Sequence, residues 1–384
     1  MEKKNVIVLG CGIGGIAAAN ILADKLKGKA NITVIDRRRN FSFPPSFPWL
    51  MIGKRTQDQV QKNIGVLKEK GINVVNEEIT SIDPVKKTVV TTTSEYTGDF
   101  LVVSLGAQYN PGAIPGFSEY AHHIYDLESA ISFRDAVAGF ERGSVAIGIS
   151  QLPFKCPAAP YEVAFLLDDY FSRKGVRENI KINFYTPEPN PVPSVGPEIA
   201  DKVLKLMGSR GISYHPQQKL KEVKKDHLAF ESGDSMDYDL LFSVPPHVAP
   251  EPVVKAGMTD TSGWIPVNVK TLETKFPGVF AIGDVTSIPT PKGYVPYLPK
   301  AGVFAHDQAK VVANNIANAI TGIGKVKEWD GDGACFLETG HGKSAFMKGK
   351  FLAEPRPLID FKEPSRIWHM QKVAFEKYWM RHWF

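Results

Sequence analysis

A glycine-rich turn close to the N-terminus constrains the fold of this chain more than any other feature. Residues 6–9 form a β-branched apolar run, residues 10–15 read Gly-Cys-Gly-Ile-Gly-Gly, and an apolar helical pattern follows. In such a strand–turn–helix unit Gly10 permits the tight turn, Gly12 lets the backbone approach a pyrophosphate, and Gly15 lets the helix pack on the strand. The turn therefore predicts a Rossmann-type dinucleotide site.

A second strand supplies the acid that such a site needs. Residues 32–35 are apolar and end at Asp36, which stands 21 residues after Gly15 and is suited to bind the hydroxyl pair of a ribose. A glycine motif alone would be a weak signal. Strand, helix, second strand and terminal acid together favour dinucleotide binding over a chance cluster of glycines.

Two later segments favour FAD over NAD at this first turn. Residues 278–284 predict a strand that ends in a Gly-Asp pair, and a helix follows from about residue 301. Two-dinucleotide flavoproteins carry a similar segment, whose aspartate, here Asp284, binds the ribityl chain of FAD. The strand at residues 100–105, followed by Gly106, resembles their other FAD-contacting segment. The alternative is an ordinary parallel strand that ends in a turn.

A second unit of the same kind lacks the features that bind a nicotinamide dinucleotide. Its first strand, residues 144–149, is followed by no glycine fingerprint. Residues 150–162 instead hold Cys156 among several prolines, which lack the N–H donors that a pyrophosphate requires. The next strand ends at Thr186 without an acid. We therefore expect a cysteine where the nicotinamide would otherwise dock.

Composition excludes several other classes of protein. A chain of 384 residues with 43% hydrophobic residues predicts two or three globular domains rather than disorder or a fibre. The three cysteines, Cys11, Cys156 and Cys335, form no Cys-x-x-Cys pair, and the histidines lack metal-ligand spacing, so no metal site is expected. A net charge of +5 is too small and scattered to predict nucleic-acid binding.

The segments around two of the cysteines carry a resemblance to a known family. Residues 153–162 read Pro-Phe-Lys-Cys-Pro-Ala-Ala-Pro-Tyr-Glu, and residues 330–340 read Asp-Gly-Asp-Gly-Ala-Cys-Phe-Leu-Glu-Thr-Gly. With residues 40–45 and 299–303, they make the chain resemble the sulfide:quinone oxidoreductases and the related flavin subunit of flavocytochrome c sulfide dehydrogenase over essentially its whole length. Many members carry a third cysteine near residues 124–127, which this chain lacks.

The resemblance implies a two-cysteine version of sulfide chemistry. Hydrosulfide would attack a disulfide between Cys156 and Cys335, leaving a persulfide and a thiolate that faces FAD. The alternative for each cysteine is a buried inert thiol. Glu162 is the candidate for moving protons, although an acid at a helix start is also favourable by itself. Lys300 is expected at the N1 and O2 edge of the flavin, and Gly302 beside the cofactor.

The C-terminal residues 364–384 predict an amphipathic helix. One broad face of the helical wheel holds Ile367, Trp368, Phe375, Tyr378, Trp379 and Trp383. The opposite face holds Arg366, Lys377 and Arg381. Aromatic and cationic faces are typical of a helix that lies in the membrane interface. The alternative is a helix packed on its own domain or on the partner in a homo-oligomer.

Membrane attachment without a nicotinamide site predicts quinone as the electron acceptor. Phe336, Tyr294 and Tyr297 are candidate walls of a quinone site from their position, although they could equally be core aromatics. No apolar run is long enough to span a bilayer and no secretory leader is recognisable, so we expect a peripheral, monotopic protein that is not exported.

The expected architecture is α/β, with two Rossmann-like domains and a C-terminal amphipathic membrane-interface helix. The FAD domain would span residues 1–110 and 268–324, the second domain residues 111–267, and the C-terminal region residues 325–384. The expected activity is oxidation of sulfide to polysulfide or persulfide sulfur with reduction of membrane quinone. The alternatives are a type-two NADH:quinone oxidoreductase, a flavocytochrome c subunit, and a non-enzymatic flavin-binding interaction protein.

Overall fold

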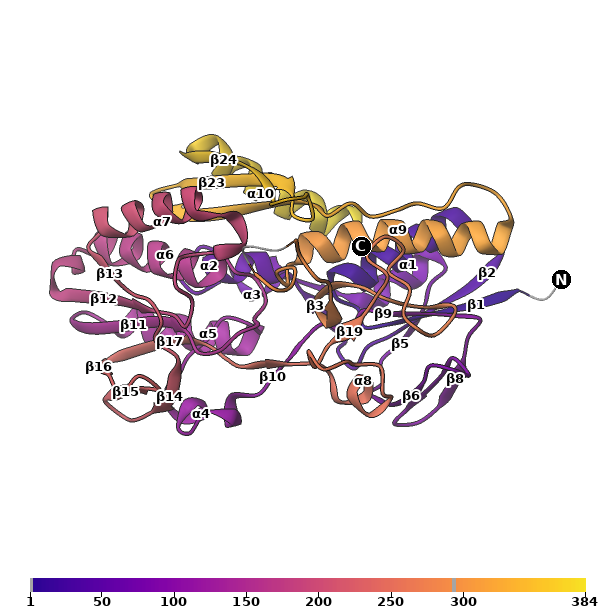
Figure 1. Cartoon of the computed structure of the whole chain (residues 1–384), viewed down its shortest axis with the longest axis horizontal. Coiled ribbons are helices and arrows are strands. Elements are labelled where there is room, and N and C mark those ends of the chain that lie inside the picture. The colour runs from indigo at the N-terminus through magenta and orange to yellow at the C-terminus, as the bar shows by residue number, and fades with distance from the viewer. Residues whose placement is uncertain (1–2, 292–294) are drawn as a thin grey trace.

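A computed structural model describes residues 3–291 and 295–384 (Figure 1). Its two largest sheets lie side by side along the long axis, and a smaller third sheet lies across them. This arrangement confirms the predicted α/β class with two Rossmann-like units. The placement of the domain boundaries stays a prediction.

The first parallel sheet carries the glycine-rich turn. Across the sheet its strands are β20 (Val279–Ala281), β9 (Phe100–Val103), β1 (Lys4–Leu9), β2 (Ala30–Ile35) and β5 (Asn73–Val75). Helices α1 (Ile13–Leu26) and α9 (Gly302–Thr321) cover one face. Strands β6 (Ile79–Asp83), β7 (Thr88–Thr91) and β8 (Glu95–Thr97), with α8 (Glu251–Lys255), cover the other. Both faces are buried, which explains the continuously apolar strands.

The second parallel sheet repeats this plan. Its strands are β13 (Ile212–His215), β12 (Ile180–Tyr185), β11 (Gly143–Ile149) and β17 (Leu240–Val244). Helices α5 (Leu127–Gly139), α6 (Ala159–Lys174) and α7 (Pro197–Ser209) pack on one face. The other face meets α4 (Phe117–Tyr120) and the hairpins β14 (Leu220–Val223), β15 (His227–Phe230) and β16 (Ser235–Asp237). Side chains of β11 alternate between the two cores, as a two-sided strand requires.

Three further pairs of short strands accompany the larger sheets. They are β3 (Asn40–Ser42) with β4 (Gln61–Asn63), β10 (Gln108–Tyr109) with β18 (His247–Val248), and β19 (Ile265–Pro266) with β21 (Thr286–Ser287). Two short helices, α2 (Phe47–Leu50) and α3 (Gln57–Val60), lie between β3 and β4. The β10–β18 pair joins segments that run between the two large sheets.

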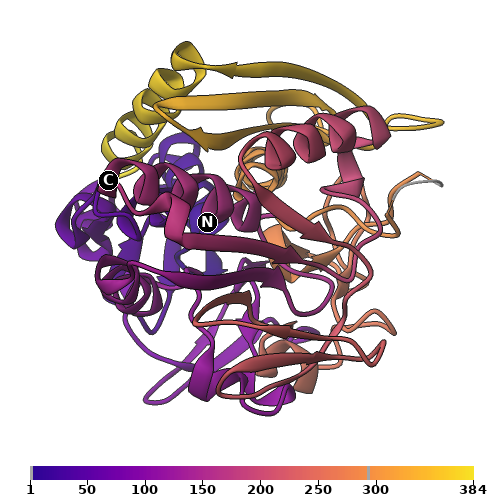
Figure 2. The same cartoon turned by 90° about the vertical axis from the view of Figure 1, so that its left-hand side faces the viewer.

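The C-terminal region forms a third layer over both units. The antiparallel strands β22 (Asp332–Gly340), β23 (Lys343–Lys350) and β24 (Leu358–Ser365) are followed by α10 (Arg366–His382). Figure 2 shows this yellow sheet across the top of the molecule. Strand β22 contacts both α6 and α9, so it bridges the two Rossmann-like units.

The C-terminal helix is confirmed, but the predicted outward face is correct only in part. Trp379 is only 2% exposed, stacks on Phe43 and packs against Phe41, and Trp383 is also buried. Ile367 and Tyr378, in contrast, are 64% and 58% exposed. The helical wheel grouped all aromatic residues together, whereas the buried side of the helix is the one that carries two tryptophans and two paired charged residues.

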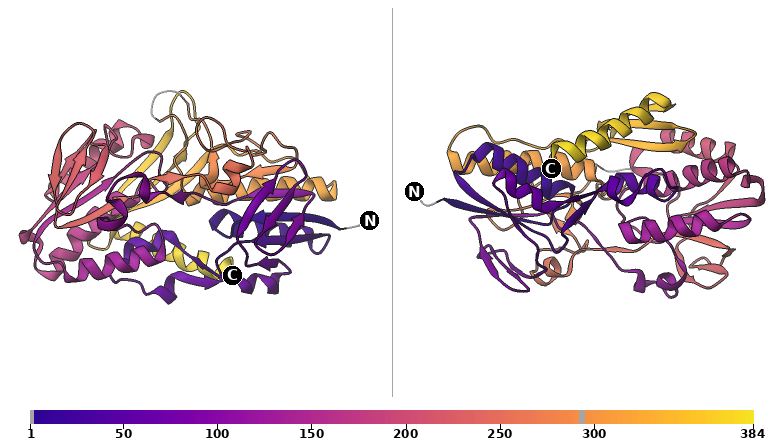
Figure 3. Two further views of the ribbon diagram at one scale, coloured as in Figure 1. Left: turned by 90° about the horizontal axis from the view of Figure 1, so that it is seen from below. Right: turned by 180° about the vertical axis from the view of Figure 1, so that it is seen from behind.

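The end of α10 lies against the first unit, as the view from behind shows (Figure 3). The side-chain amide of Asn20 on α1 donates to the carbonyl oxygen of Trp383 at 3.2 Å. Across residues 3–291 and 295–384, no helix combines the length and the apolar composition that crossing a bilayer requires.

We expect Trp379→Ala to lower the free energy of unfolding by about 3–5 kcal/mol, because it removes a buried indole from an aromatic cluster. Urea denaturation followed by circular dichroism measures the change. The control Tyr378→Ala should stay within about 0.5 kcal/mol of the parent, because its ring is exposed. Equal effects of the two substitutions would contradict this packing.

Candidate active site

The glycine-rich turn has the space that a dinucleotide requires. Gly10 has φ +92°, and a Cβ there would collide with the Ser104 carbonyl. A Cβ on Gly15 would collide with the Gly10 carbonyl, so helix and strand pack as closely as predicted. At Gly12 no atom lies within 4 Å of an added Cβ. The turn therefore packs tightly against Ser104 and against its own helix, and it leaves open space beside Gly12.

Asp36 is fixed at the end of β2 beside this turn. Its carboxylate accepts hydrogen bonds from the Cys11 N–H at 2.7 Å and from the Arg38 main chain and guanidinium at 2.9–3.1 Å. Burial opposes ionisation, but the hydrogen bonds and charge of Arg38 hold the pKa of Asp36 below its ordinary value. The carboxylate is thus ionised and oriented, as a ribose-binding acid must be.

Asp284 provides a test of whether the site fits FAD. It follows β20, and its Oδ1 is buried with no hydrogen-bond partner among the described residues. Burial raises the pKa of this carboxyl, against the opposing charges of Lys155 and Lys300. A buried oxygen without a partner is costly, and a ligand hydroxyl would satisfy it.

The neighbouring backbone agrees with this fit. Gly106 has φ +67° and open space beside it, and a Cβ on Gly302 would lie 2.6 Å from Ile13 Cδ1, so the first turns of α1 and α9 lie together. Two helix N-termini beside an orphaned carboxylate suit the pyrophosphate and ribityl parts of FAD. The residues present therefore fit FAD, in agreement with the predicted cofactor.

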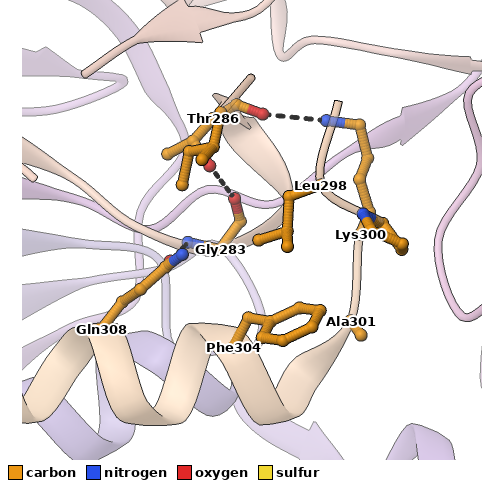
Figure 4. Close-up of a pocket in the computed structure, with 9 residues that line it drawn as sticks. Gly283, Thr286, Leu298, Lys300, Ala301, Phe304 and Gln308 are labelled. Carbon is orange, nitrogen blue, oxygen red and sulfur yellow. Dashed lines mark hydrogen bonds between the residues drawn. The ribbon is translucent and has the colours of Figure 1, made fainter. Parts of the chain in front are cut away.

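The Lys300 amine makes three close contacts within the protein. Its Nζ donates to the carbonyl oxygens of Asp284 at 2.6 Å and Thr286 at 3.1 Å, and it lies 3.4 Å from the Trp264 ring centroid. Figure 4 shows the amine directed at Thr286, above a small pocket that Leu298 and Phe304 also line. Burial lowers the pKa of Lys300 to about 7, against the opposing effect of Asp284. Contact with the flavin edge stays a prediction.

The first-cysteine segment docks directly against the start of α9. The Cys156 N–H donates to the Lys300 carbonyl at 2.6 Å, and residues 155 and 300 form a parallel β-bridge. Cys156 has φ +57°, a left-handed conformation that a non-glycine residue adopts only when its surroundings enforce it. Such strained conformations cluster at functional sites, so this one favours a functional role for the segment.

The same segment fills the place of a second dinucleotide. Helix α6 starts with Ala159 and Pro160, so its first turn lacks an N–H donor. Tyr161 is fully buried and stacks on Phe184 of β12, with ring centroids 4.6 Å apart. The first turn of this helix is where the pyrophosphate of a dinucleotide would bind in a Rossmann unit, and here Pro160 removes one of its N–H donors.

The fold brings Cys335 to Cys156 across 179 residues of sequence. Cys335 lies on β22, which packs on α6, and both thiols are free and partly buried. Burial, and then the charge of Cys335, raise the pKa of the Cys156 thiol above its usual value. Burial and Glu162 raise the pKa of the Cys335 thiol to about 12. Reduced thiols here are protonated at neutral pH, so thiolate chemistry requires a proton acceptor nearby.

The proton acceptor near the two thiols is the Glu162 carboxylate, which is buried. It is 3% exposed, and its Oε1 accepts hydrogen bonds from the Lys372 amine at 2.7 Å and the Glu338 N–H at 2.8 Å. Burial raises the pKa of Glu162, and Lys372 offsets only part of this effect. Lys372 comes from α10, where sequence analysis expected a membrane-facing surface. The sequence feature that could have predicted this burial is that Lys372 and Glu376 lie on the same side of the helix as Trp379.

Lys155 is a second residue that sequence analysis missed. Its amine donates to the Tyr109 hydroxyl and lies 4.8 Å from the centroid of that ring. Burial works against its charge, but Tyr109 and Asp284 outweigh burial and raise the pKa of Lys155. It is therefore a cation close enough to Asp284 for the two charges to interact. The sequence feature that could have identified Lys155 is its position directly before Cys156.

Of the three candidate quinone contacts, the two that lie among the described residues come from different parts of the fold. Phe336 packs against Phe346 and Phe375, with ring centroids 5.0 and 6.5 Å away, beneath α10. Tyr297 is 42% exposed and bridges to Pro289 in a separate loop. Tyr294 lies outside the described residues. The quinone assignment stays a prediction.

A family model agrees with this geometry. The model described as pyridine nucleotide-disulphide oxidoreductase matches residues 4–148 and 170–315. The chain belongs to this family. Its members share the paired dinucleotide domains that the fold shows.

Individual relatives narrow the resemblance. The mitochondrial sulfide:quinone oxidoreductase of Mus musculus is 24% identical over 381 residues, which are 93% of this chain and 80% of the relative. The solved structure of the sulfide:quinone oxidoreductase from Aquifex aeolicus has a TM-score of 0.91 and 26% identity, covering 99% of this chain and 91% of that one. A type II NADH:quinone oxidoreductase of Staphylococcus haemolyticus is 23% identical, with 84% of each chain covered. The predicted resemblance is confirmed.

We expect Asp284→Ala to weaken FAD binding about 10- to 100-fold, because a hydrogen bond to a buried carboxylate is lost. Reconstitution of the FAD-depleted protein, followed by quenching of flavin fluorescence, gives the affinity. Asp307→Ala on the exposed side of α9, which removes only an ion pair with Lys310, is the control and should bind FAD normally. Unchanged affinity in Asp284→Ala would exclude this FAD pose.

Proposed function

We propose that this chain is a sulfide:quinone oxidoreductase that uses Cys156, Cys335 and bound FAD. The observation that carries the proposal is the Cys156 N–H hydrogen bond to the Lys300 carbonyl, which sets a thiol segment where the family binds its nicotinamide. Relatives with this activity align over nearly the whole chain. Sulfur, rather than a pyridine coenzyme, is thus the electron donor.

The two cysteines support a balanced reaction. In the oxidised protein they would form a disulfide, and hydrosulfide attacks one sulfur, so that one S–S bond forms and another breaks. One cysteine becomes a persulfide and the other leaves as a thiolate. Bound FAD would supply the two-electron acceptor and pass the electrons to quinone. Glu162 would receive the proton that the sulfur gives up, because it is the buried carboxylate next to both thiols.

The exposed side of α10 supports attachment to a membrane surface. It carries the apolar side chains Ile367, Met370, Phe375 and Tyr378. The cations Arg366, Lys377 and Arg381 are exposed beside them. Such a mixture suits the lipid interface, where a quinone is available. The cluster of Phe336 and Phe346 directly beneath the helix would form part of the quinone path.

The NADH-dependent alternative has less support. The relative of that class aligns over less of the chain than the sulfide-oxidising relatives do. Pro160 also removes an N–H donor from the first turn of α6, where its nucleotide would need one. A flavoprotein without enzymatic activity would give no role to the strained Cys156 or to its neighbour Cys335.

Cys156→Ser and Cys335→Ser should each slow reduction of the flavin by sulfide by about 100-fold or more, because neither can form the disulfide. Anaerobic stopped-flow absorbance measures the rate. Cys11→Ser is the matched control, since Cys11 is buried inside the glycine-rich turn. Reduction by dithionite should remain normal in all three. Sulfide reduction that survives in both variants would refute the proposed chemistry.

Met370→Glu with Tyr378→Glu should weaken binding to vesicles of phosphatidylglycerol and phosphatidylcholine by about tenfold or more, because each substitution removes apolar area from the lipid contact. Co-sedimentation measures binding. Gln371→Glu adds the charge of one of these two substitutions without that loss and serves as the control. If sedimentation equilibrium instead shows that the double variant breaks a homo-oligomer, with vesicle binding unchanged, this face is a subunit interface.

A further inference from the structure

Three aromatic side chains gather beside the lysine that precedes Cys156. Tyr109 of β10 and His247 of β18 are paired across the two strands, and their rings meet edge-on with centroids 5.2 Å apart. The Tyr125 ring lies 5.2 Å from the His247 ring and 6.2 Å from the Tyr109 ring. The Lys155 amine lies 4.8 Å from the Tyr109 centroid and 5.9 Å from the Tyr125 centroid. We call these four residues the Lys155 cluster.

The charge of Lys155 has no carboxylate partner. Among the described residues its amine donates to the Tyr109 hydroxyl, and no carboxylate lies within ion-pair distance of it. Tyr109 in turn donates to the Tyr125 carbonyl at 2.6 Å, so the single proton of its hydroxyl is also used. An ammonium has three N–H donors, and a cation removed from water without a counter-ion is costly. The amine therefore has two donors and a positive charge to offer an anion.

Two buried polar atoms of the cluster also lack a partner. Tyr125 and His247 are 5% and 6% exposed, and the Tyr125 hydroxyl and His247 Nε2 have no hydrogen-bond partner among the described residues. The other ring nitrogen of His247, Nδ1, lies 2.7 Å from the Pro245 carbonyl and must donate to it. Burial, with the charge of Lys155, lowers the pKa of His247 to about 3, so the ring is neutral and Nε2 carries a lone pair. A bound ligand would satisfy both atoms.

The unused groups together indicate the chemistry of the ligand. The N–H donors of Lys155 and the Tyr125 hydroxyl suit an anion, whereas the lone pair of His247 Nε2 repels an anion that carries no hydrogen. A ligand that satisfies all three is a small anion with one hydrogen to donate. Hydrosulfide is such an anion, because its sulfur accepts hydrogen bonds and its S–H group donates one. Bromide has the same charge and a similar size but no hydrogen, so it fits less well.

We propose that the Lys155 cluster binds hydrosulfide before it reacts. This inference rests on the proposed function, which names sulfide as the electron donor. Lys155 and the Tyr125 hydroxyl donate to the sulfur, and the S–H group donates to His247 Nε2. Tyr109 is a positioning residue, since its hydroxyl holds the Lys155 amine. Because Lys155 directly precedes Cys156, the bound anion lies beside the first-cysteine segment.

Binding is measured on the FAD-loaded double variant Cys156→Ser and Cys335→Ser, in which hydrosulfide binds without reacting. Anaerobic isothermal titration calorimetry at slightly alkaline pH, where the anion predominates, should show hydrosulfide binding about tenfold tighter than bromide. Adding Lys155→Met should weaken binding of both anions about tenfold or more, because the cation is lost. Adding His247→Asn keeps a donor for the Pro245 carbonyl but removes Nε2, so it should weaken hydrosulfide about tenfold and leave bromide no weaker.

Tyr125→Phe should also weaken hydrosulfide binding about tenfold, since it removes a hydroxyl that donates to the anion. Tyr214→Phe is the matched control: it removes another buried hydroxyl that lacks a partner among the described residues, on β13 of the second sheet, and should leave binding unchanged. Equal affinity for hydrosulfide and bromide before these additions, or no loss from any of the three substitutions, would overturn the site. Weakened FAD binding together with normal hydrosulfide binding would also overturn it, because the cluster would then hold the cofactor.

Turnover separates this inference from the proposed function. In the protein with both cysteines, each of the three substitutions should raise the sulfide concentration for half-maximal flavin reduction about tenfold, while the limiting rate stays within about twofold of the parent. An unchanged half-maximal concentration would contradict the site even where sulfide reduces the flavin. Hydrosulfide binding as expected in the double variant, without flavin reduction by sulfide in the parent, would instead refute the proposed function alone.

Discussion

The hydrogen bond between the Cys156 N–H and the Lys300 carbonyl is the constraint on which the rest of the site depends. It ties the first-cysteine segment of the second unit to the start of α9 in the first unit. Cys156 has a left-handed backbone conformation, which the surrounding contacts must hold in place. The contact thereby brings the Cys156 segment to the Gly302 end of α9.

The C-terminal region supplies the remaining residues of the candidate site. Strand β22 spans α6 and α9 and delivers Cys335, while α10 closes over it with the Lys372–Glu162 and Arg55–Glu376 ion pairs. Removal of one partner from a buried pair is costly, so these contacts fix α10 in one orientation. The same helix thereby presents an apolar and cationic face outward. The C-terminal region thus supplies Cys335, the Lys372 partner of Glu162 and the exposed apolar side chains of α10.

Sequence predicted the parts of the site that depend on local geometry. Gly10, Gly15, Asp36 and Asp284 act within strand–turn–helix units of a few residues, so their spacing alone indicates where they lie. Cys156 stood out because prolines replace a glycine fingerprint. These features are short-range.

The remaining parts depend on tertiary packing, which spacing does not encode. A helical wheel shows that α10 has two faces, but not which of its aromatic residues are buried: Trp379 and Trp383 are, whereas Phe375 and Tyr378 are exposed. Lys372, Glu338 and His369 become neighbours only when β22, α6 and α10 pack together. Lys300 is similar, because its amine finds its carbonyl partners only through the loop that follows β20.

The most direct test of this account compares two electron donors on the same anaerobic, FAD-loaded protein. Absorbance of the flavin is followed while sulfide is added to one sample and NADH to another. Rapid bleaching by sulfide with no response to NADH is the predicted result. Bleaching by NADH together with no response to sulfide would contradict it.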